Sequence, residues 1–327
     1  MSTVESSLKE GIPVLIIGYN RSDFISNLID FVSQKRKLIY VFVDGPKNMD
    51  DVGAIQTAET VQKLATLHNL QVRLSGVNLG CRKAIPTAID WVLSKYESVI
   101  ILEDDIWPSD SFFEFMDYCL LHFAHTENVF QVNGWAPVCS KNILPPVFLS
   151  RHAFCWGWGT WRDKWKKSNI EMANVDYVKE LNYAIETSAF KTNDLFFDIW
   201  LDRLTQCAQG KDTWDYQWYL SVWMNQGKCI ATSKPLTTNI GFDKRASRTK
   251  TIPNYLDTSV SESDARKHLS ACLSQFQSLG LMSESKWDRY LDYLLLGVHT
   301  GTSIRESMLN FIIYISNKLK RIRHFNA

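Results

Sequence analysis

The first hundred residues alternate short apolar runs with longer segments in which apolar side chains recur at helical spacing. Continuous apolar runs are typical of strands buried on both faces of a parallel sheet, and the longer segments predict helices that cover it. The predicted strands are 13–17, 38–43, 71–74 and one that begins at 99, and the predicted helices between them are 24–33, 52–69 and 82–96. This alternation predicts an α/β fold with a mostly parallel sheet, wound by right-handed crossovers and flanked by helices.

The pattern continues more loosely to residue 251 and then changes. Further helices are predicted at 112–126, 194–209 and 214–226, and further strands at 129–132 and 228–231. From 252 the segments are polar, helical and less aromatic, so we expect one domain at 1–251 and a helical extension at 252–327. Near the end, apolar residues fall on one face of a helix at 304–322, with cations at its C-terminal end. Such a helix either lies on an anionic membrane surface or packs on the main domain or another subunit.

Three carboxylates follow the fourth predicted strand. The apolar run 99–102 leads directly into Glu103, Asp104 and Asp105, and ligands of open α/β sheets bind at the carboxyl ends of strands. Adjacent acids repel one another unless a cation offsets their charge. A Mg²⁺ or Mn²⁺ ion, with ligand phosphates completing its shell, is the usual partner. The alternative is a solvated acidic turn; Pro108 and Ser109, which open the next helix, favour the metal site.

Two aromatic segments are further candidates. Glycines separate the tryptophans around Gly157, which predicts that Trp156 or Trp158 presents a ring face to a sugar or a base. Core packing is the alternative, and we expect it for Trp161 and Trp165 on a short helix. Further along, Trp214 and Asp215 open a helix. A partly buried Asp215 suits a general base, although its spacing alone favours an N-terminal carboxylate that complements the helix dipole.

Composition and charge narrow the function classes. A net charge of +1 offers no field that would attract a polyanion, so we expect no nucleic-acid partner. The seven cysteines are scattered without a CxxC pair, which disfavours a disulfide framework or a zinc site and favours a reducing cytosol. No signal peptide and no membrane-spanning run are expected. The basic segment 243–250, with Arg245 and Arg248, is predicted to be a mobile loop that either closes over a diphosphate or is simply solvated.

These motifs, taken in order, resemble a known family. The Asp-Gly turn after the second strand, Glu103-Asp104-Asp105, Gly157-Trp158-Gly159-Thr160-Trp161 and Trp214-Asp215-Tyr216-Gln217-Trp218 are similar to the pattern of GT-A glycosyltransferases. Within them the chain is most similar to the N-acetylglucosaminyltransferase I group and its bacterial polysaccharide relatives. The resemblance covers roughly residues 12 to 250, and it implies a Rossmann-like GT-A fold, a nucleotide-sugar donor (UDP favoured), a divalent metal and a glycan or lipid-linked acceptor.

The resemblance also implies roles for single residues. Asp105 would hold the metal and Asp215 would be the base of an inverting transfer. The other residues would contact the nucleotide sugar or the acceptor: Gly18, Asn20, Arg21, Asp44, Glu103, Asp104, Arg245 and Arg248 on the nucleotide side, and Asn133, Gly134, Trp135, Trp156, Gly157, Trp158 and Trp214 around the sugars. Bacterial surface-polysaccharide synthesis, in the cytoplasm or at the inner face of the cell membrane, is the implied setting.

Two alternatives stay open. A sugar-nucleotide pyrophosphorylase shares the metal and the strand order, but residues 18–21 do not form a glycine-rich phosphate loop. A non-catalytic carbohydrate-binding relative is permitted by the 12 tryptophans, but it leaves the acidic triplet without a task. The chain also departs from the bacterial relatives, which often carry a histidine where Arg245 and Arg248 stand; this departure bears on donor closure and on the metal.

Overall fold

The computed structural model describes residues 11–135, 144–187, 194–242 and 261–278, together with Gly280, Asp288 and Leu291. Within the two helices that border the gap at 188–193, side chains are described up to residue 183 and again from residue 197.

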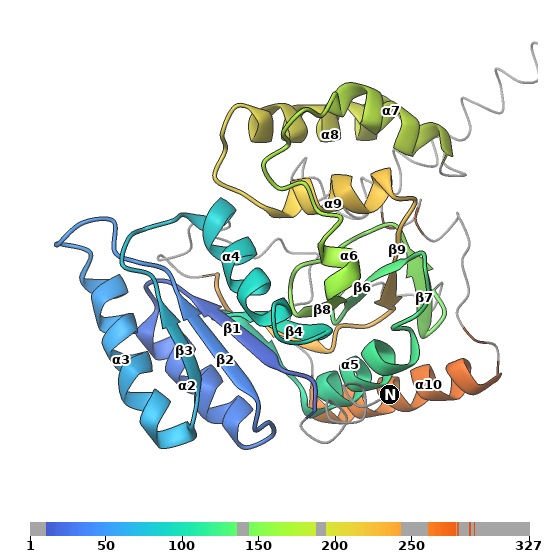
Figure 1. Ribbon diagram of the computed structural model, residues 1–327. Helices are drawn as coiled ribbons and strands as arrows, with labels where there is room; N and C mark the ends of the chain where they lie inside the picture. The colour runs from blue at the N-terminus through green and yellow to red at the C-terminus, as the bar shows by residue number, and fades with distance from the viewer. Residues whose placement is uncertain are drawn as a thin grey trace, which may run out of the picture.

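An eight-stranded sheet forms the centre of the described chain (Figure 1). Its order is β3-β2-β1-β4-β8-β6-β9-β7; only β8 and β7 run antiparallel to their neighbours. The strands are β1 (Val14–Gly18), β2 (Ile39–Val43), β3 (Gln71–Leu74), β4 (Ser98–Glu103), β6 (Val129–Asn133), β7 (Val147–Ser150), β8 (Trp158–Trp161) and β9 (Lys228–Thr232). The predicted α/β fold with a mostly parallel sheet is therefore confirmed.

The strand order changes direction next to β1. The chain adds β2 and β3 on one side of β1 and then returns to place β4 on its other side, with Ile17 opposite Glu103. In an open α/β sheet this reversal separates the crossover helices at the carboxyl ends of the two central strands and leaves a crevice there, where ligands bind. The predicted acidic triplet lies at this point.

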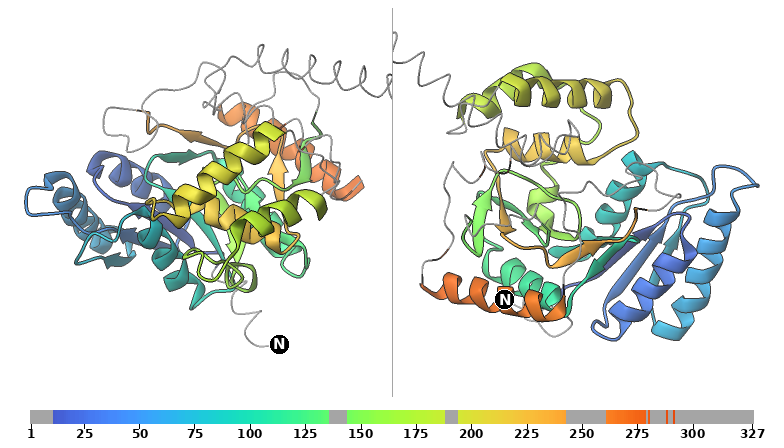
Figure 2. Two further views of the ribbon diagram at one scale, coloured as in Figure 1. Left: turned by 90° about the horizontal axis from the view of Figure 1, so that it is seen from above. Right: turned by 180° about the vertical axis from the view of Figure 1, so that it is seen from behind.

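Helices cover both faces of the sheet (Figures 1 and 2). Alternate residues of each strand point to opposite faces, so Leu15 and Ile17 of β1 pack in one core cluster and Val14 and Ile16 in the other. On the first face lie α4 (Cys81–Leu93), α6 (Arg162–Trp165), α7 (Tyr177–Thr187), α8 (Asp194–Ala208) and α9 (Asp215–Met224); on the second lie α2 (Ser22–Ser33), α3 (Val52–His68), α5 (Asp110–His122) and α10 (Glu262–Ser278).

Most predicted elements are present within a few residues of their predicted bounds, and the errors lie in the second half. The prediction that Trp161 and Trp165 share a helix is wrong, because Trp161 ends β8 and only Trp165 is helical. A small two-stranded sheet of β5 (Ile106–Pro108) and β10 (Thr237–Asn239), and strand β7, were not predicted. Ser109 caps α5 by accepting a hydrogen bond from the Phe112 amide, as expected of a helix that opens there.

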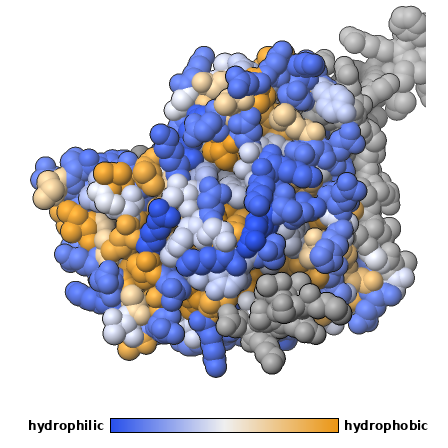
Figure 3. Space-filling model, viewed as in Figure 1, coloured by the Kyte–Doolittle hydropathy of each residue, from blue (hydrophilic) through white to orange (hydrophobic). Residues whose placement is uncertain are grey.

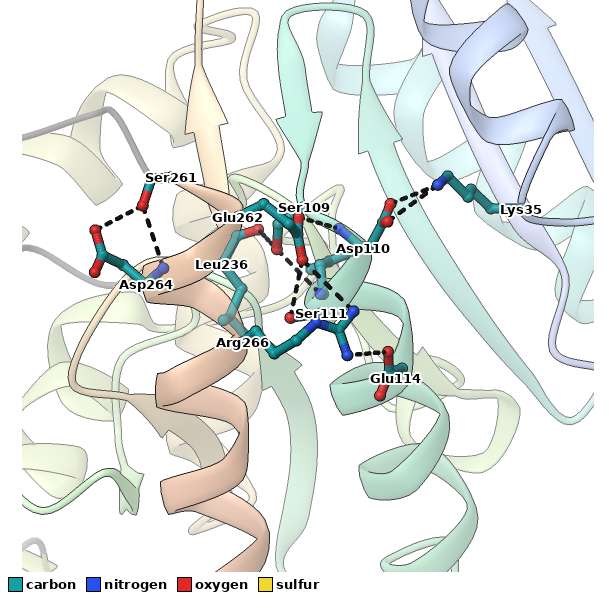
Figure 4. A network of polar contacts seen from close by, with 11 residues as sticks. Lys35, Ser109, Asp110, Ser111, Glu114, Leu236, Ser261, Glu262, Asp264 and Arg266 are labelled. Atoms are coloured by element: carbon teal, nitrogen blue, oxygen red, sulfur yellow. Dashed lines mark hydrogen bonds and ion pairs between the residues drawn. The ribbon is translucent and has the colours of Figure 1, made fainter.

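The first helix of the predicted C-terminal extension is built into the main core. α10 lies against α5, and its side chains at Ala265, Leu269 and Cys272 belong to the second core cluster. At its start, the Glu262 carboxylate accepts hydrogen bonds from the Asp110 amide and the Ser111 hydroxyl (Figure 4). The described part of the extension is therefore packed on the α/β domain.

Three further observations complete the architecture. The predicted amphipathic helix at 304–322 lies outside the described residues. None of the described helices is both long and apolar enough to span a membrane.

Large apolar side chains are exposed around α3 and β3, and the left of Figure 3 shows apolar and polar residues interspersed there, which is ordinary for a protein surface. The exposed apolar residues of this region are Met49, Val52, Leu67, Leu74 and Val77.

Candidate functional site

Arg21 joins the two acidic residues at the carboxyl ends of β1 and β4. Arg21 follows β1, and its guanidinium forms an ion pair with the Asp104 carboxylate. A second ion pair joins it to Asp105, with 3.0 Å between Arg21 Nη1 and Asp105 Oδ2. Asp104 is 4% exposed and Asp105 18% exposed. The structure therefore brings together, from loops 83 residues apart, a basic and two acidic residues that the sequence predicted at one site.

Burial and charge shape the protonation of this cluster. Burial raises the pKa of the Asp104 carboxyl above its usual range, against the opposing effect of Arg21 and with a further contribution from the nearby Asp105. Burial alone would lower the pKa of Arg21, but the Asp104 and Asp105 carboxylates raise it. Arg21 therefore stays charged and is the cation that offsets the two acids.

Asp105 lies at the mouth of the cluster and faces the small sheet. Its backbone oxygen accepts a hydrogen bond from the Ile240 amide at 2.9 Å, and the Gly241 backbone lies directly against its carboxylate. Its Oδ2 atom pairs with Arg21 Nη1, and its side chain is partly exposed. A partly exposed carboxylate fits a Mg²⁺ or Mn²⁺ ion whose other ligands are phosphate oxygens and water.

The loop after β1 is held tightly around this cluster. A Cβ at Gly18 would lie 2.5 Å from Ile25 and 3.5 Å from Asp104 Oδ2, so a larger residue would push against α2. The Asn20 carbonyl lies under Gly53 at the start of α3. Glu103 is the last residue of β4 and is partly exposed. The predicted nucleotide contacts of these residues stay predictions.

Asp44 has a structural task at the end of β2. Its two oxygens accept hydrogen bonds from the Leu79 amide at 2.8 Å and the Gly80 amide at 3.0 Å, and also from the Gly45 amide and the Asn78 side chain. These four donors occupy the accepting capacity of a carboxylate. Asp44 therefore shapes the 78–80 loop, and its predicted contact with a uracil base stays a prediction.

Two of the predicted ligand-facing aromatic residues lie at the same edge of the sheet. Trp135 follows β6 and packs on Trp156 with 4.4 Å between ring centroids, and Trp156 packs in turn on Phe242. Trp156 is partly exposed, whereas Trp135 is 5% exposed, and its Nε1 atom has no hydrogen-bond partner in the described structure. Trp156 therefore remains the better candidate for a sugar contact.

Several other predicted sugar contacts are occupied by the protein itself. Trp158 is fully buried and stacks on the buried Trp214 with 5.4 Å between ring centroids, so of the two tryptophans predicted as alternatives Trp156 is the one with a partly exposed ring. Asn133 is also fully buried and donates to the His152 carbonyl. A Cβ at Gly134 would meet the Phe112 ring, and one at Gly157 would meet Thr237 and Phe112. Close packing of the core, rather than an open platform, explains these residues.

Asp215 begins α9 and is partly exposed. The Thr213 hydroxyl donates a hydrogen bond to its Oδ1 atom, and the Gln217 side chain donates to the Thr213 carbonyl at 2.6 Å. Asp215 thus occupies the first turn of a helix, as the dipole interpretation expects, and is oriented by a buried hydroxyl. Both the structural and the catalytic interpretations accommodate this geometry.

Some residues of this region were not predicted from the sequence, and some predicted residues lie outside the described chain. Gly241, Asp212 and Thr213 had no motif that singled them out, because their roles depend on contacts between distant segments. Arg245 and Arg248 lie outside the described residues. Within the described part, no group of three or more His, Cys, Asp or Glu side chains could hold a metal ion by itself.

Comparisons with known proteins add little to this geometry. No family model matches the chain, and no curated protein matches it. Among solved structures it is similar to the mannosyltransferase PcManGT from Pyrobaculum calidifontis in complex with GDP-Man and Mn²⁺, with 13% sequence identity over 91% of this chain and 84% of that one. The TM-score is 0.37, and an overlap this loose carries no argument about fold or function.

Proposed function

We propose that this protein is a metal-dependent glycosyltransferase that moves a sugar from a nucleoside-diphosphate donor to a glycan or lipid-linked acceptor. The observation that carries the proposal is the Arg21–Asp104–Asp105 cluster at the carboxyl ends of β1 and β4, where the strand order reverses. Ligands of open α/β sheets bind at this place. An arginine suits a diphosphate, and a partly exposed carboxylate suits the metal that accompanies it.

Each member of the cluster has a separate task in this proposal. Asp105 holds a Mn²⁺ or Mg²⁺ ion, which when bound neutralises the charge that develops on the departing diphosphate. Arg21 is directed toward the diphosphate. Asp104, buried behind it, fixes the guanidinium through their ion pair. Glu103 contributes at the edge of the ribose and sugar subsites.

Asp215 is the base in the proposed transfer. It takes the proton from an acceptor hydroxyl, whose oxygen bonds to the anomeric carbon as the bond from that carbon to the diphosphate oxygen breaks. A single displacement of this kind inverts the anomeric configuration and needs one carboxylate, whereas a hydrolase also needs an acid partner. The Thr213 hydroxyl supports this role because it orients the Asp215 carboxylate.

The donor and the setting follow from the sequence resemblance. We favour a UDP-sugar donor and surface-polysaccharide synthesis of the bacterial type, with the protein in the cytoplasm or on the inner face of the membrane. The loop after β1 gives the pyrophosphorylase alternative no support. It is not a glycine-rich phosphate loop, and it contacts the acidic residue Asp104 through the Arg21 side chain. The carbohydrate-binding alternative loses support because packing accounts for many of the tryptophans; Trp158, Trp165, Trp200, Trp214, Trp218 and Trp223 lie in one core cluster.

A thermal-shift panel tests the proposal. UDP, dTDP, GDP and CDP are added singly, each with and without Mn²⁺, to the wild-type protein and to Asp105→Asn. We expect one nucleotide to raise Tm only with Mn²⁺ and Asp105→Asn to lose that increment, because a ligand that binds only the folded state stabilises it by mass action. A shift that needs no metal would contradict the role of Asp105. No shift with any nucleotide would contradict the transferase itself.

A further inference from the structure

Gly80 stands between two carboxylates from distant parts of the chain. Its amide donates to Asp44 Oδ2 at 3.0 Å. On its other side, a Cβ at position 80 would lie 2.8 Å from Asp212 Oδ1, and the backbone φ is +72°. Space and backbone conformation thus both require glycine here, and glycine allows the two carboxylates to approach the same residue.

Asp212 caps α4 from a segment 130 residues away. Gly80 is the N-cap residue of α4 and has no side chain with which to accept its first amides. The Asp212 carboxylate accepts them instead, from Cys81 at 3.1 Å and from Arg82 at 2.7 Å. A carboxylate that accepts these amides stabilises the helix N-terminus, and here it also fixes the place of the segment that carries it.

Arg82 ties the same helix end to the helical layer. Its guanidinium donates to the Cys207 carbonyl at 2.7 Å, at the end of α8, and to the Ile170 and Glu171 carbonyls at 3.3 and 3.2 Å. The segment between Cys207 and Asp212 is therefore attached to α4 at both of its ends.

This segment leads directly into Asp215. Thr213 follows Asp212, is fully buried, and donates its hydroxyl to the Asp215 carboxylate. Hydrogen bonds and the short stretches of backbone between them thus connect Asp44 at the end of β2, through the 78–82 loop and Asp212, to the start of α9.

We propose that Asp212 is a positioning residue that couples the Asp44 loop to the Asp215 carboxylate. It holds the start of α9 at a fixed place relative to the loop beside the nucleotide subsite, so that the Asp215 carboxylate is in place when the donor is bound. The catalytic part of this inference rests on the proposed function, whereas the coupling of the two segments does not.

Amide hydrogen exchange in the ligand-free protein tests the coupling. We expect Asp44→Asn, introduced alone, to speed amide exchange in the peptide 211–217. Introduced into the Asp212→Ala variant, it should not change the exchange rate of that peptide further. Additive effects of the two substitutions would overturn the inference, whether or not the protein is a transferase. The matched control is Asp176→Ala, which removes another capping carboxylate, one that accepts from the Lys179 amide at the start of α7.

Steady-state release of UDP from UDP-glucose, UDP-galactose and UDP-N-acetylglucosamine with Mn²⁺ tests the positioning. We expect Asp212→Ala to lower kcat at least tenfold with the donor KM within twofold, and Asp176→Ala to leave both unchanged while lowering Tm equally. Asp212→Glu, which keeps the carboxylate, should recover part of kcat. A kcat for Asp212→Ala equal to that of Asp176→Ala would overturn the inference. Without nucleotide binding or UDP release by the wild-type protein, the proposed function fails, and the exchange result alone decides the coupling.

Discussion

A Cβ atom at Gly241 would lie 2.1 Å from Oδ2 of Asp105, far closer than two such atoms can approach. The segment that follows β10 therefore passes over the proposed metal ligand with no room for a side chain. Since Ile240 also donates its amide to the Asp105 carbonyl, both ends of this residue are fixed by the same short segment.

Gly241→Ala should abolish the Mn²⁺-dependent part of the nucleotide thermal shift, because the added methyl group must displace the Asp105 carboxylate. Gly76→Ala is the matched control, since a Cβ there meets nothing within 4 Å. We expect the control to keep the full shift. An unchanged shift in Gly241→Ala would show that Asp105 need not keep its position to bind the ion.

Arg21→Ala should lower the free energy of unfolding by about 3–5 kcal/mol, because it leaves the buried Asp104 carboxylate without its cation. Adding Asp104→Asn should recover part of the loss. Arg266→Ala breaks exposed ion pairs with Glu114 and Glu262 and should cost no more than about 1 kcal/mol. Urea unfolding of the four proteins measures these differences; equal losses for Arg21 and Arg266 would refute the buried-pair interpretation.

Trp156 and Trp158 should separate function from packing. Trp158→Ala removes a fully buried ring and should destabilise the protein by about 3–5 kcal/mol. Trp156→Ala removes a partly exposed ring and should cost less stability while weakening acceptor use, seen as a raised acceptor KM. Chemical denaturation and transfer kinetics of both variants check the contrast, and a reversal of the two effects would restore Trp158 as the sugar contact.

The stability of the protein should fall between pH 6.5 and 4 partly because of His268. Burial lowers the pKa of His268 to about 4, with a smaller effect of Lys234, from an ordinary value of 6.5. As pH falls through this window, His268 becomes protonated in the unfolded chain but stays neutral in the folded protein. The free energy of unfolding that neutral His268 contributes at pH 7 is therefore lost. The loss approaches about 3 kcal/mol.

His268→Gln should flatten this part of the stability curve, which urea unfolding at half-unit steps of pH measures. His122→Gln, on the exposed side of α5, should leave the curve as it is in the wild-type protein. A curve of unchanged slope in His268→Gln would assign the acid sensitivity to other groups.

A chain ending at residue 251, the boundary expected from the sequence, should be less stable than the full protein. Its truncation removes α10 and uncovers the apolar side of α5, where Phe276 stacks on Tyr118 at 5.0 Å between ring centroids. Apolar area of this kind contributes roughly 25 cal/mol per Å² when buried. A Tm equal to that of the full chain would show that 1–251 is an independent domain.

The first four strands were predictable because periodicity alone decides them. β1, β2 and β4 are short apolar runs next to amphipathic helices, and both faces of the resulting sheet are covered, whereas β3 alternates polar and apolar residues and is mostly exposed at the edge of the sheet. The acidic triplet was predictable for the same reason: the end of β4 is visible in the sequence as the place where apolar residues stop. Arg21 could be named from the resemblance, but its ion pairs with the two acids could not.

The aromatic segments were not predictable because glycines and tryptophans occur both in closely packed cores and at open binding faces. The run around Trp158 has no helical or alternating period, and its glycines allow close packing of β8 against β4 and Leu120, where a Cβ at Gly159 would lie 2.9 Å from that leucine. Local sequence does not distinguish such packing from an open binding face. The capping of α4 by Asp212 was equally unpredictable, since no sequence pattern near residue 212 indicates a contact with residue 81.

The position of β8 also constrains the order in which the chain can fold as it is synthesised. β1 to β4 pair among themselves, so the sheet can assemble as far as Glu103 from residues already made. β6 does not touch β4, because β8 lies between them. The strand at 129–133 must therefore wait for residues 158–161 before it can join the growing sheet, and during that interval its apolar residues have no strand beside them, which is a window for misassembly.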